Sequence, residues 1–222
     1  MLLALDTSTR IMSLALHSGD TVIFEQTLTV GRNHSEMLAP MIQQTMEQCD
    51  VNLPDLKAMA VAVGPGSYTG LRIGVSLAKG MAAVHQLPLV GVSTLEILAL
   101  GQPFYTTRYT LIAVVPAGRG RIIAESYRGK KGRWVSNEDA EIQTWDDLLE
   151  TVDDQIYVTG EITGEGLTKI ADAQSKDKPI TLIPPAYRLR RAGFLAEEAW
   201  RRIREAEDES EYSPDKVMPI YL

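Results

Sequence analysis

The sequence is poor in cysteine, because Cys49 is the only one among its 222 residues. One thiol cannot form a disulfide within the chain or build a zinc site from cysteines, and it suits a reducing compartment. Long apolar runs are also missing, since Gly, Pro or a charged residue interrupts each run before it reaches the length of a membrane span. The first run, residues 2–5, is too short for the apolar core of a secretory signal. We therefore expect a cytoplasmic protein without a membrane segment.

Basic residues are fewer than acidic ones. Lys and Arg number 22 against 29 for Asp and Glu, which gives a net charge of -7. A protein that binds nucleic acid by itself usually has a basic surface, because neutralising phosphates supplies most of that affinity. We therefore expect any role with RNA to be shared with a partner. The hydrophobic share of 45% and the charged share of 23% predict an ordinary packed core.

Most signatures of catalysis are absent as well. His17, His34 and His85 lie in different predicted elements, and none is four residues from another, which excludes a helical two-histidine metal site. The chain has no Gly-x-Ser-x-Gly nucleophile elbow and no Walker A loop. Cys49 lies on the apolar face of its predicted helix, where a core position is favoured over a nucleophile. We expect no catalytic residue and no bound metal.

Hydrophobic periodicity predicts the order βββαβαβα in the first half of the chain. The expected strands are residues 2–5, 12–16, 22–29, 58–63 and 89–92, and the expected helices are residues 34–49, 68–85 and, from a capping box at 93–96, about 94–101. The second half repeats this order, with strands at 111–115, 121–127, around 134–135, 156–159 and 180–183, and helices at 145–152, 164–173 and 192–207.

Two tandem units of this order predict an α/β protein made of two ribonuclease H-like lobes, the architecture of the actin-like ATPase superfamily. Ligands lie between the halves in that superfamily. We place the boundary at Gln102-Pro103, so that residues 1–103 form an N-terminal lobe with partner-binding helices and residues 104–222 form a C-terminal lobe. The last helix belongs to the second lobe in sequence, but packing back on the N-terminal lobe stays open.

A carboxylate and three hydroxyls follow the first predicted strand, at Asp6, Thr7, Ser8 and Thr9. Actin-like kinases hold a nucleotide phosphate and its metal with such a turn. The alternative is that these side chains bond only the backbone of their own turn, as Asp, Ser and Thr do in many unrelated proteins. The sequence supports both interpretations equally.

A second candidate phosphate loop joins a buried strand to a helix at Gly64-Pro65-Gly66-Ser67. Free N–H groups and the helix dipole can accept an anion at such a place. A simply capped strand-to-helix turn is the safer interpretation of the loop taken alone. The candidate phosphate and cleft residues are therefore Asp6, Thr7, Ser8, Gly64, Gly66, Ser67 and Arg72.

Small residues four apart form a stripe on the helix that follows, at Gly70, Gly74, Ala78 and Ala82. Each interior glycine costs roughly 0.5–1 kcal/mol relative to alanine, and a close helix-to-helix approach would offset that loss. The partner helix is either residues 34–49 of the same chain or a helix of another chain, which we favour. The predicted partner interface is His34, Met37, Leu38, Met41, Gly70, Gly74, Leu77, Ala78, Met81 and Ala82.

Basic residues gather in two places. One cluster is Arg119, Arg121, Arg128, Lys130, Lys131 and Arg133, and the other is Arg188, Arg190, Arg191, Arg201, Arg202 and Arg204. Either cluster could touch RNA phosphates within an assembly. The favoured interpretation for both is a solvated surface, because nearby glutamates offset the second cluster.

Four segments together resemble the TsaB family, also called YeaZ. They are residues 3–9 (LALDTST), 34–36 (HSE), 64–74 (GPGSYTGLRIG) and 91–95 (GVSTL). The resemblance is dense over about residues 1–101 and thinner afterwards, where Gly160-Glu161, residues 164–166 and residues 219–222 are similar to the family. One departure is Pro116-Ala117-Gly118-Arg119 where the family commonly has Asp-Ala-Arg, so any ligand role of that aspartate is lost or moved.

The resemblance implies a non-catalytic subunit needed to make N6-threonylcarbamoyladenosine at position 37 of tRNAs that read codons starting with A. It implies that two helices of the N-terminal lobe bind and activate the paralogous catalytic subunit TsaD, that the ATPase TsaE joins the complex, and that tRNA is met only through the complex. No cofactor is required by the chain itself. ATP or ADP at the complex interface, and a homodimer in the absence of TsaD, are left open.

Two other functions compete with this one. An actin-like ATP-dependent kinase, or an acyl or carbamoyl transferase, is suggested by the Asp6 turn, but a second phosphate loop and a catalytic carboxylate cannot be assigned. A peptidase lacks any nucleophile and base that can be named.

Overall fold

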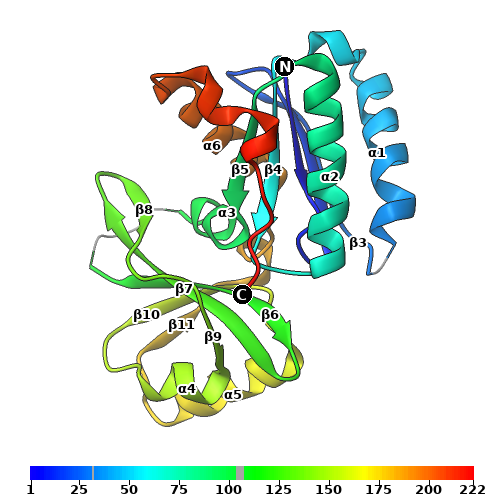
Figure 1. Cartoon of the computed structure of the whole chain (residues 1–222). Coiled ribbons are helices and arrows are strands. Elements are labelled where there is room, and N and C mark those ends of the chain that lie inside the picture. Colours follow the sequence, from blue (N-terminus) through cyan, green and yellow to red (C-terminus); the bar gives the residue numbers. More distant parts are fainter. Residues whose placement is uncertain (32, 104–107) are drawn as a thin grey trace. The chain divides into compact units, whose positions relative to one another are not determined.

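The computed structural model describes residues 1–31, 33–103 and 108–222. Its contacts divide the chain into two compact units, Met1–Ile97 with Arg190–Tyr221, and Leu98–Leu189 with Leu222. Each unit is built on one twisted sheet (Figure 1). Among the described helices, none combines the length and the apolarity that a membrane crossing requires.

The first unit begins with three antiparallel strands and continues with alternating helices and strands. Its elements are β1 (Leu2–Asp6), β2 (Ile11–His17), β3 (Val22–Thr29), α1 (His34–Gln48), β4 (Ala58–Gly64), α2 (Tyr68–His85), β5 (Leu89–Ser93), α3 (Thr94–Leu100), which runs across the boundary, and α6 (Ala192–Glu205). The sheet has the order β3-β2-β1-β4-β5, with β1 antiparallel to β2 and parallel to β4. The predicted order βββαβαβα is confirmed here.

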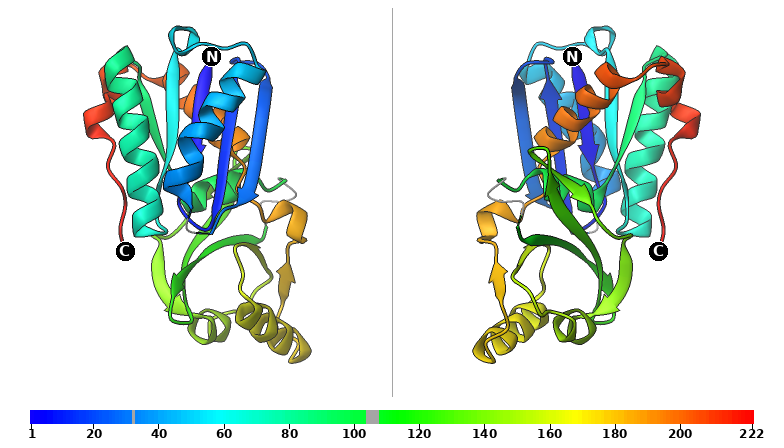
Figure 2. Two further views of the ribbon diagram at one scale, coloured as in Figure 1. Left: turned by 90° about the vertical axis from the view of Figure 1, so that its right-hand side faces the viewer. Right: turned by 90° about the vertical axis from the view of Figure 1, so that its left-hand side faces the viewer.

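Helices cover both faces of this sheet (Figure 2). Because side chains alternate along a strand, Leu3 and Leu5 of β1 join the core on one face with α1 and α2, whereas Leu2 and Ala4 join the core on the other face with α6. The parallel strand β4 is buried over its whole length, as its continuous apolar run predicted.

The second unit has its own sheet and core. Its elements are β6 (Thr110–Gly118), β7 (Arg121–Lys130), β8 (Arg133–Ser136), β9 (Glu141–Thr144), α4 (Trp145–Glu150), β10 (Ile156–Gly160), α5 (Gly164–Ser175) and β11 (Ile180–Leu182). The sheet has the order β11-β10-β6-β7-β8, and β9 pairs with the free part of β7. Trp145 and Leu148 of α4 and Ile170 of α5 pack against the sheet residues Val114 and Val158.

Two features differ from the expected repeat. The second unit contains the additional strand β9, and α6 packs on the first unit, which is the arrangement that the sequence left open for the last helix of residues 104–222. Ala192, Leu195, Ala196 and Ala199 of α6 are fully buried against the first sheet, which would otherwise expose an apolar face. The first boundary in the structure falls at Ile97, before the predicted Gln102-Pro103, and residues 104–107 lie outside the described residues.

The predicted capping box at the start of α3 is not formed, because the Glu96 side chain bonds a different partner. The Ser93 Oγ accepts a hydrogen bond from the Leu95 backbone N–H at 3.3 Å, but the Glu96 carboxylate receives two hydrogen bonds from Arg202 of α6, at 2.7 Å each. Glu96 therefore ties α6 to α3, because a guanidinium is a stronger partner for a carboxylate than a backbone N–H.

Candidate functional site

Both oxygens of the Asp6 carboxylate are engaged within the chain. Oδ1 accepts hydrogen bonds from the Ser8 backbone N–H at 2.9 Å and from the Ser8 hydroxyl at 2.6 Å, and Oδ2 accepts from Nε of Arg190 at 2.7 Å. Asp6 and Arg190 are 1% and 0% exposed, so this is a buried ion pair. The observed geometry favours the interpretation in which Asp6 bonds its own turn, with a buried arginine in addition.

Arg190 fixes the whole turn after β1. Its guanidinium also donates to the Thr9 hydroxyl at 2.6 Å and to the Ile11 carbonyl at 3.4 Å. The sequence grouped Arg190 with surface arginines that could touch RNA, and that assignment is wrong because the side chain is fully buried. Nothing in the local sequence marks this position, since its partner Asp6 is 184 residues away.

The second candidate loop packs directly on the first. The Ser67 backbone N–H donates to the Ser8 carbonyl at 2.6 Å, and a Cβ at Gly66 would lie only 2.0 Å from that carbonyl oxygen. Ser67 caps α2, because its hydroxyl accepts from the Gly70 N–H at 3.2 Å. Gly64 has a φ of +108°, and a Cβ there would meet the Ile220 carbonyl oxygen at 2.5 Å. The predicted phosphate residues of the two loops thus lie close together, but most of their contacts are with one another.

Arg72 lies apart from these buried groups, on the exposed side of α2. Its guanidinium stacks 3.9 Å from the centroid of the Tyr68 ring, and Nε donates to the Tyr221 hydroxyl at 3.4 Å. The rings of Tyr68 and Tyr221 are themselves 5.0 Å apart. Arg72 thus holds the C-terminal segment against the start of α2.

The stripe of small residues faces the chain's own sheet. Gly70, Gly74, Ala78 and Ala82 are all buried, and the Thr7 hydroxyl donates to the Gly70 carbonyl at 2.7 Å. A Cβ at Gly74 would lie 2.2 Å from that same hydroxyl oxygen. The glycines of the stripe therefore do not make the predicted intermolecular contact, because Gly70 and Gly74 approach the Thr7 turn of the same chain. Ala78 and Ala82 lie in the core that also contains residues of α1.

Three of the six predicted interface residues outside the stripe also belong to the core. His34, Leu38 and Met41 are 4%, 1% and 6% exposed, and Nε2 of His34 lies 2.7 Å from the Thr9 carbonyl oxygen. Of the ten predicted interface residues, Met37, Leu77 and Met81 are the ones that are partly exposed.

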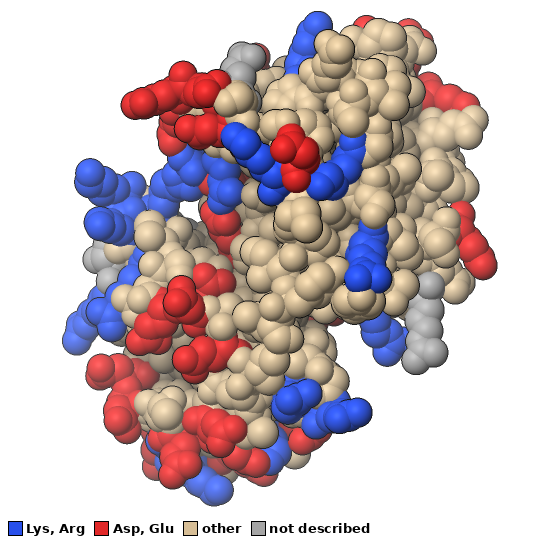
Figure 3. Space-filling view, viewed as in Figure 1, with Lys and Arg blue, Asp and Glu red and all other residues tan. Residues whose placement is uncertain are grey.

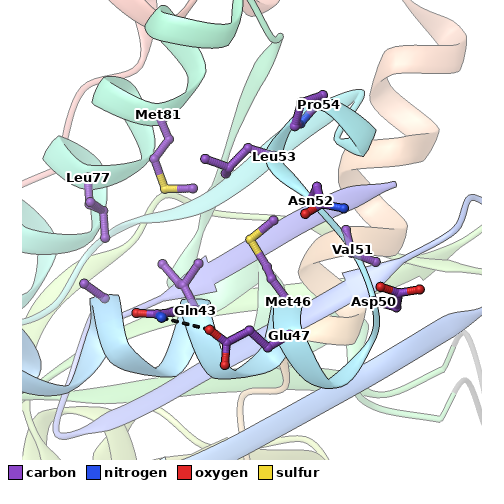
Figure 4. Close-up of a pocket in the computed structure, with 12 residues that line it drawn as sticks. Gln43, Met46, Glu47, Asp50, Val51, Asn52, Leu53, Pro54, Leu77 and Met81 are labelled. Carbon is purple, nitrogen blue, oxygen red and sulfur yellow. Dashed lines mark hydrogen bonds between the residues drawn. The ribbon is translucent and has the colours of Figure 1, made fainter.

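Leu77 and Met81 open onto an apolar groove of about 780 Å³ beside α1 and α2 (Figure 4). Its apolar lining is Ala39, Ile42, Met46, Val51, Leu53, Pro54, Leu77 and Met81. The polar residues Gln43, Glu47, Asp50 and Asn52 complete the lining, and Gln43 donates to Glu47 at 2.8 Å. Ile42 and Met46 are 6% and 8% exposed, so they belong to the core and still reach the surface beside α2.

The arginines of the last helix are largely paired within the chain. Arg201 and Arg202 both bond the buried Glu198, and Arg191 bonds Glu25. Burial alone would raise the pKa of Glu198, but hydrogen bonds and charges from the two arginines lower it below its ordinary value. Glutamates offset these arginines, as the sequence indicated, but the expected solvated surface does not hold for Arg190 and Glu198, which are 0% and 3% exposed.

No cluster of three or more His, Cys, Asp or Glu side chains suited to a metal occurs within residues 1–31, 33–103 and 108–222. The first unit thus presents the Asp6 turn, the loop after β4 and the Glu198 ion pairs as polar clusters, and the groove beside α1 and α2 as an apolar surface.

Known proteins resemble this chain over most of its length. The family model for TsaD, tRNA N6-adenosine threonylcarbamoyltransferase, matches residues 25–179. The tRNA threonylcarbamoyladenosine biosynthesis protein TsaB of Bacillus subtilis (strain 168) is 34% identical over 165 residues, which are 73% of this chain and 71% of the relative. The protein of the same name from Escherichia coli (strain K12) is 36% identical over 138 residues, 62% of this chain and 59% of the relative.

The solved structure of YeaZ from Pseudomonas aeruginosa has the same fold, with a TM-score of 0.75 at 23% identity over 99% of each chain. The predicted fold class of two ribonuclease H-like lobes is confirmed by this likeness and by the two sheets. The shared fold does not assign the chain to a family, but the sequence relatives do. This chain belongs to the TsaB, or YeaZ, family of tRNA threonylcarbamoyladenosine biosynthesis proteins.

Proposed function

We propose that this chain is a non-catalytic subunit for the formation of N6-threonylcarbamoyladenosine at position 37 of tRNAs that read codons starting with A. In this proposal it binds and activates a TsaD-type catalytic subunit, and a TsaE-type ATPase joins them. Family membership supports a role in this biosynthesis. The partner is proposed from the groove beside α1 and α2.

The groove carries the proposal because it is an apolar surface on a helix pair. Met46 of α1 and Met81 of α2 contribute thioether side chains, which adapt to the shape of a partner, and Leu77 lies one turn before Met81 on α2 (Figure 4). Patches of this kind that are rimmed by polar residues are typical of protein contacts. An apolar helix of the catalytic subunit would bury the groove, and a second copy of this chain could occupy it when that subunit is absent.

The state of the Asp6 turn supports a non-catalytic role. A carboxylate that holds a metal or activates a nucleophile needs at least one oxygen directed at its ligand, whereas both oxygens of Asp6 accept hydrogen bonds from Ser8 and Arg190. We accordingly propose that the chain itself requires no cofactor, and that any ATP or ADP lies at the interface of the complex.

Light scattering tests the pairing directly. Mixing the purified chain with its cognate TsaD-type subunit at micromolar concentration should give a heterodimer. Met81→Glu should weaken pairing at least tenfold, because it places a charge in the groove. Val84→Glu is the matched control, since Val84 is 77% exposed on the same helix and does not line the groove. The proposal fails if the two wild-type proteins do not interact. It also fails if Met81→Glu and Val84→Glu pair with equal affinity and both melt at the wild-type temperature.

Loss of the gene, followed by nucleoside analysis of tRNA, tests the biological role. The modified nucleoside should disappear and should return when the wild-type gene is restored. A normal level of the nucleoside in the deletion strain would contradict a required role.

A further inference from the structure

The hairpin formed by β7 and β8 concentrates positive charge in an acidic protein. Arg128, Lys130, Lys131 and Arg133 occupy four of six consecutive positions with no acidic residue among them, although the whole chain has a net charge of -7. Lys and Arg gather over this hairpin in the space-filling view, toward the left of Figure 3. The remaining two positions are glycines.

The backbone of the hairpin is tightly specified. Lys131 and Gly132 form its two-residue turn with φ values of +50° and +79°, the signature of a type I′ turn, and Lys130 pairs with Arg133 across it. Cross-strand partners share one face of a sheet, so Lys130 and Arg133 lie together, with Arg128 next along that face. Like charges placed opposite each other on a hairpin repel, so Lys130 and Arg133 do not stabilise this pairing of strands by attraction.

Three of these cations differ from the ion-paired arginines of α6. Within the described residues, Arg128, Lys130 and Lys131 form no ion pair, and all three are exposed. The turn between β6 and β7 is different, because the Glu165 carboxylate lies against it at Gly120. On β7 the basic face ends near Ser126, whose hydroxyl donates to Glu138 at 3.1 Å.

We propose that the β7–β8 hairpin binds phosphates of an RNA backbone when the chain works in its complex. The inference rests on the proposed function, which makes RNA the substrate of that complex. The two-stranded hairpin holds its cations at fixed positions, where they can contact successive phosphates of an RNA backbone. The acidic side chain of Glu138 limits this contact to the tip of the hairpin.

Binding of an unmodified tRNA transcript to the complex with the cognate catalytic subunit tests the hairpin. The double variant Lys130→Glu/Lys131→Glu should bind at least tenfold more weakly than wild type at 50 mM salt. Two lost phosphate contacts should lower the slope of log affinity against log salt by about 2, so that wild type loses about tenfold more affinity than the variant between 50 and 200 mM.

The matched control is Arg119→Glu/Arg121→Glu, which changes the net charge equally in the turn before β7 and at the first residue of β7. It should bind tRNA within about threefold of wild type and keep the wild-type salt slope. Equal losses for both variants would overturn the inference, because net charge alone would then explain them, and so would unchanged binding by the lysine variant.

Pairing with the catalytic subunit separates this inference from the proposed function. The lysine variant should form the heterodimer with wild-type affinity. If wild type itself fails to pair, the proposed function fails. If wild type pairs but the lysine variant does not, the hairpin is a protein contact and the RNA inference is overturned.

Discussion

Gly74 has no room for a side chain, because a Cβ there would lie 2.2 Å from the Thr7 hydroxyl oxygen. That hydroxyl is itself held by the Gly70 carbonyl at 2.7 Å, so it cannot move away without losing a buried hydrogen bond. Gly74→Ala should therefore lower the free energy of unfolding by about 1–3 kcal/mol, as overpacking of a core does. Urea unfolding of the isolated chain measures this change.

Gly80 supplies the control on the same helix. Nothing lies within 4 Å of a Cβ at Gly80, so Gly80→Ala should raise the free energy of unfolding by roughly 0.5–1 kcal/mol through helix propensity. Opposite signs for the two variants would establish that the stripe packs inside the chain. Equal stabilisation by both would show that Gly74 faces open space.

Single residues also mark the limit of what the sequence can predict. The spacing of Gly70 and Gly74 indicated a close approach correctly, but a stripe does not say what it meets, and the contact is Thr7. Arg190 stands beside the exposed Arg191 in sequence, and its burial depends on Asp6 at the other end of the chain. Such long-range pairs leave no local periodicity to read.

At the scale of elements, α6 is fixed to the first unit by ion pairs as well as by its apolar face. Glu198 accepts hydrogen bonds from Arg201 and Arg202, and Arg202 also reaches Glu96 of α3 and the Gly91 carbonyl of β5. Burial alone would lower the pKa of Arg202, but Glu96 and Glu198 raise it above its ordinary value. Glu198 is therefore a buried carboxylate that folding keeps ionised.

Replacing Glu198 should give a pH-dependent loss of stability. Because the pKa of Glu198 is lowered in the folded chain, the unfolded chain takes up the proton first as the pH falls below the ordinary glutamate value of about 4.3. Glu198→Gln should thus be less stable than wild type at pH 7, and the difference should shrink as the pH falls through the acid range. Urea unfolding of both proteins at several pH values checks this. A difference that stays constant with pH would contradict it.

Most elements were predictable because their periodicity is strong, and the exceptions have physical reasons. Strand β9 (Glu141–Thr144) was missed because its residues are mostly exposed, which removes the alternation of apolar and polar side chains that marks a half-buried strand. The capping box of α3 was predicted from spacing alone, but Glu96 bonds Arg202 instead. The groove was only partly predicted, because Ile42 and Met46 are buried on one side and line the surface on the other.

For the whole molecule, the order of elements did not reveal to which unit the last helix belongs. Chain order placed α6 with the second half, whereas the first sheet needs a cover on the face opposite α1 and α2 (Figure 2). The signal was present in β1 and β4, where both alternating sets of side chains are apolar. A sheet that is apolar on two faces must be covered on both, and the first half supplies α1 and α2 for one face only.

This arrangement predicts that residues 1–103 will not fold alone. Without α6, the sheet face formed by Leu2, Ala4 and Val90 is exposed, and Asp6 stays buried without Arg190, a loss that costs roughly 3–5 kcal/mol by itself. Such losses are comparable with the whole stability of a domain, about 5–15 kcal/mol. The fragment should show no cooperative thermal transition by circular dichroism, and a peptide of residues 190–222 should restore one. The same peptide with Leu195→Asp should not, because Leu195 is fully buried against the sheet. Cooperative unfolding of the fragment without any peptide would show that the first unit does not depend on its last helix.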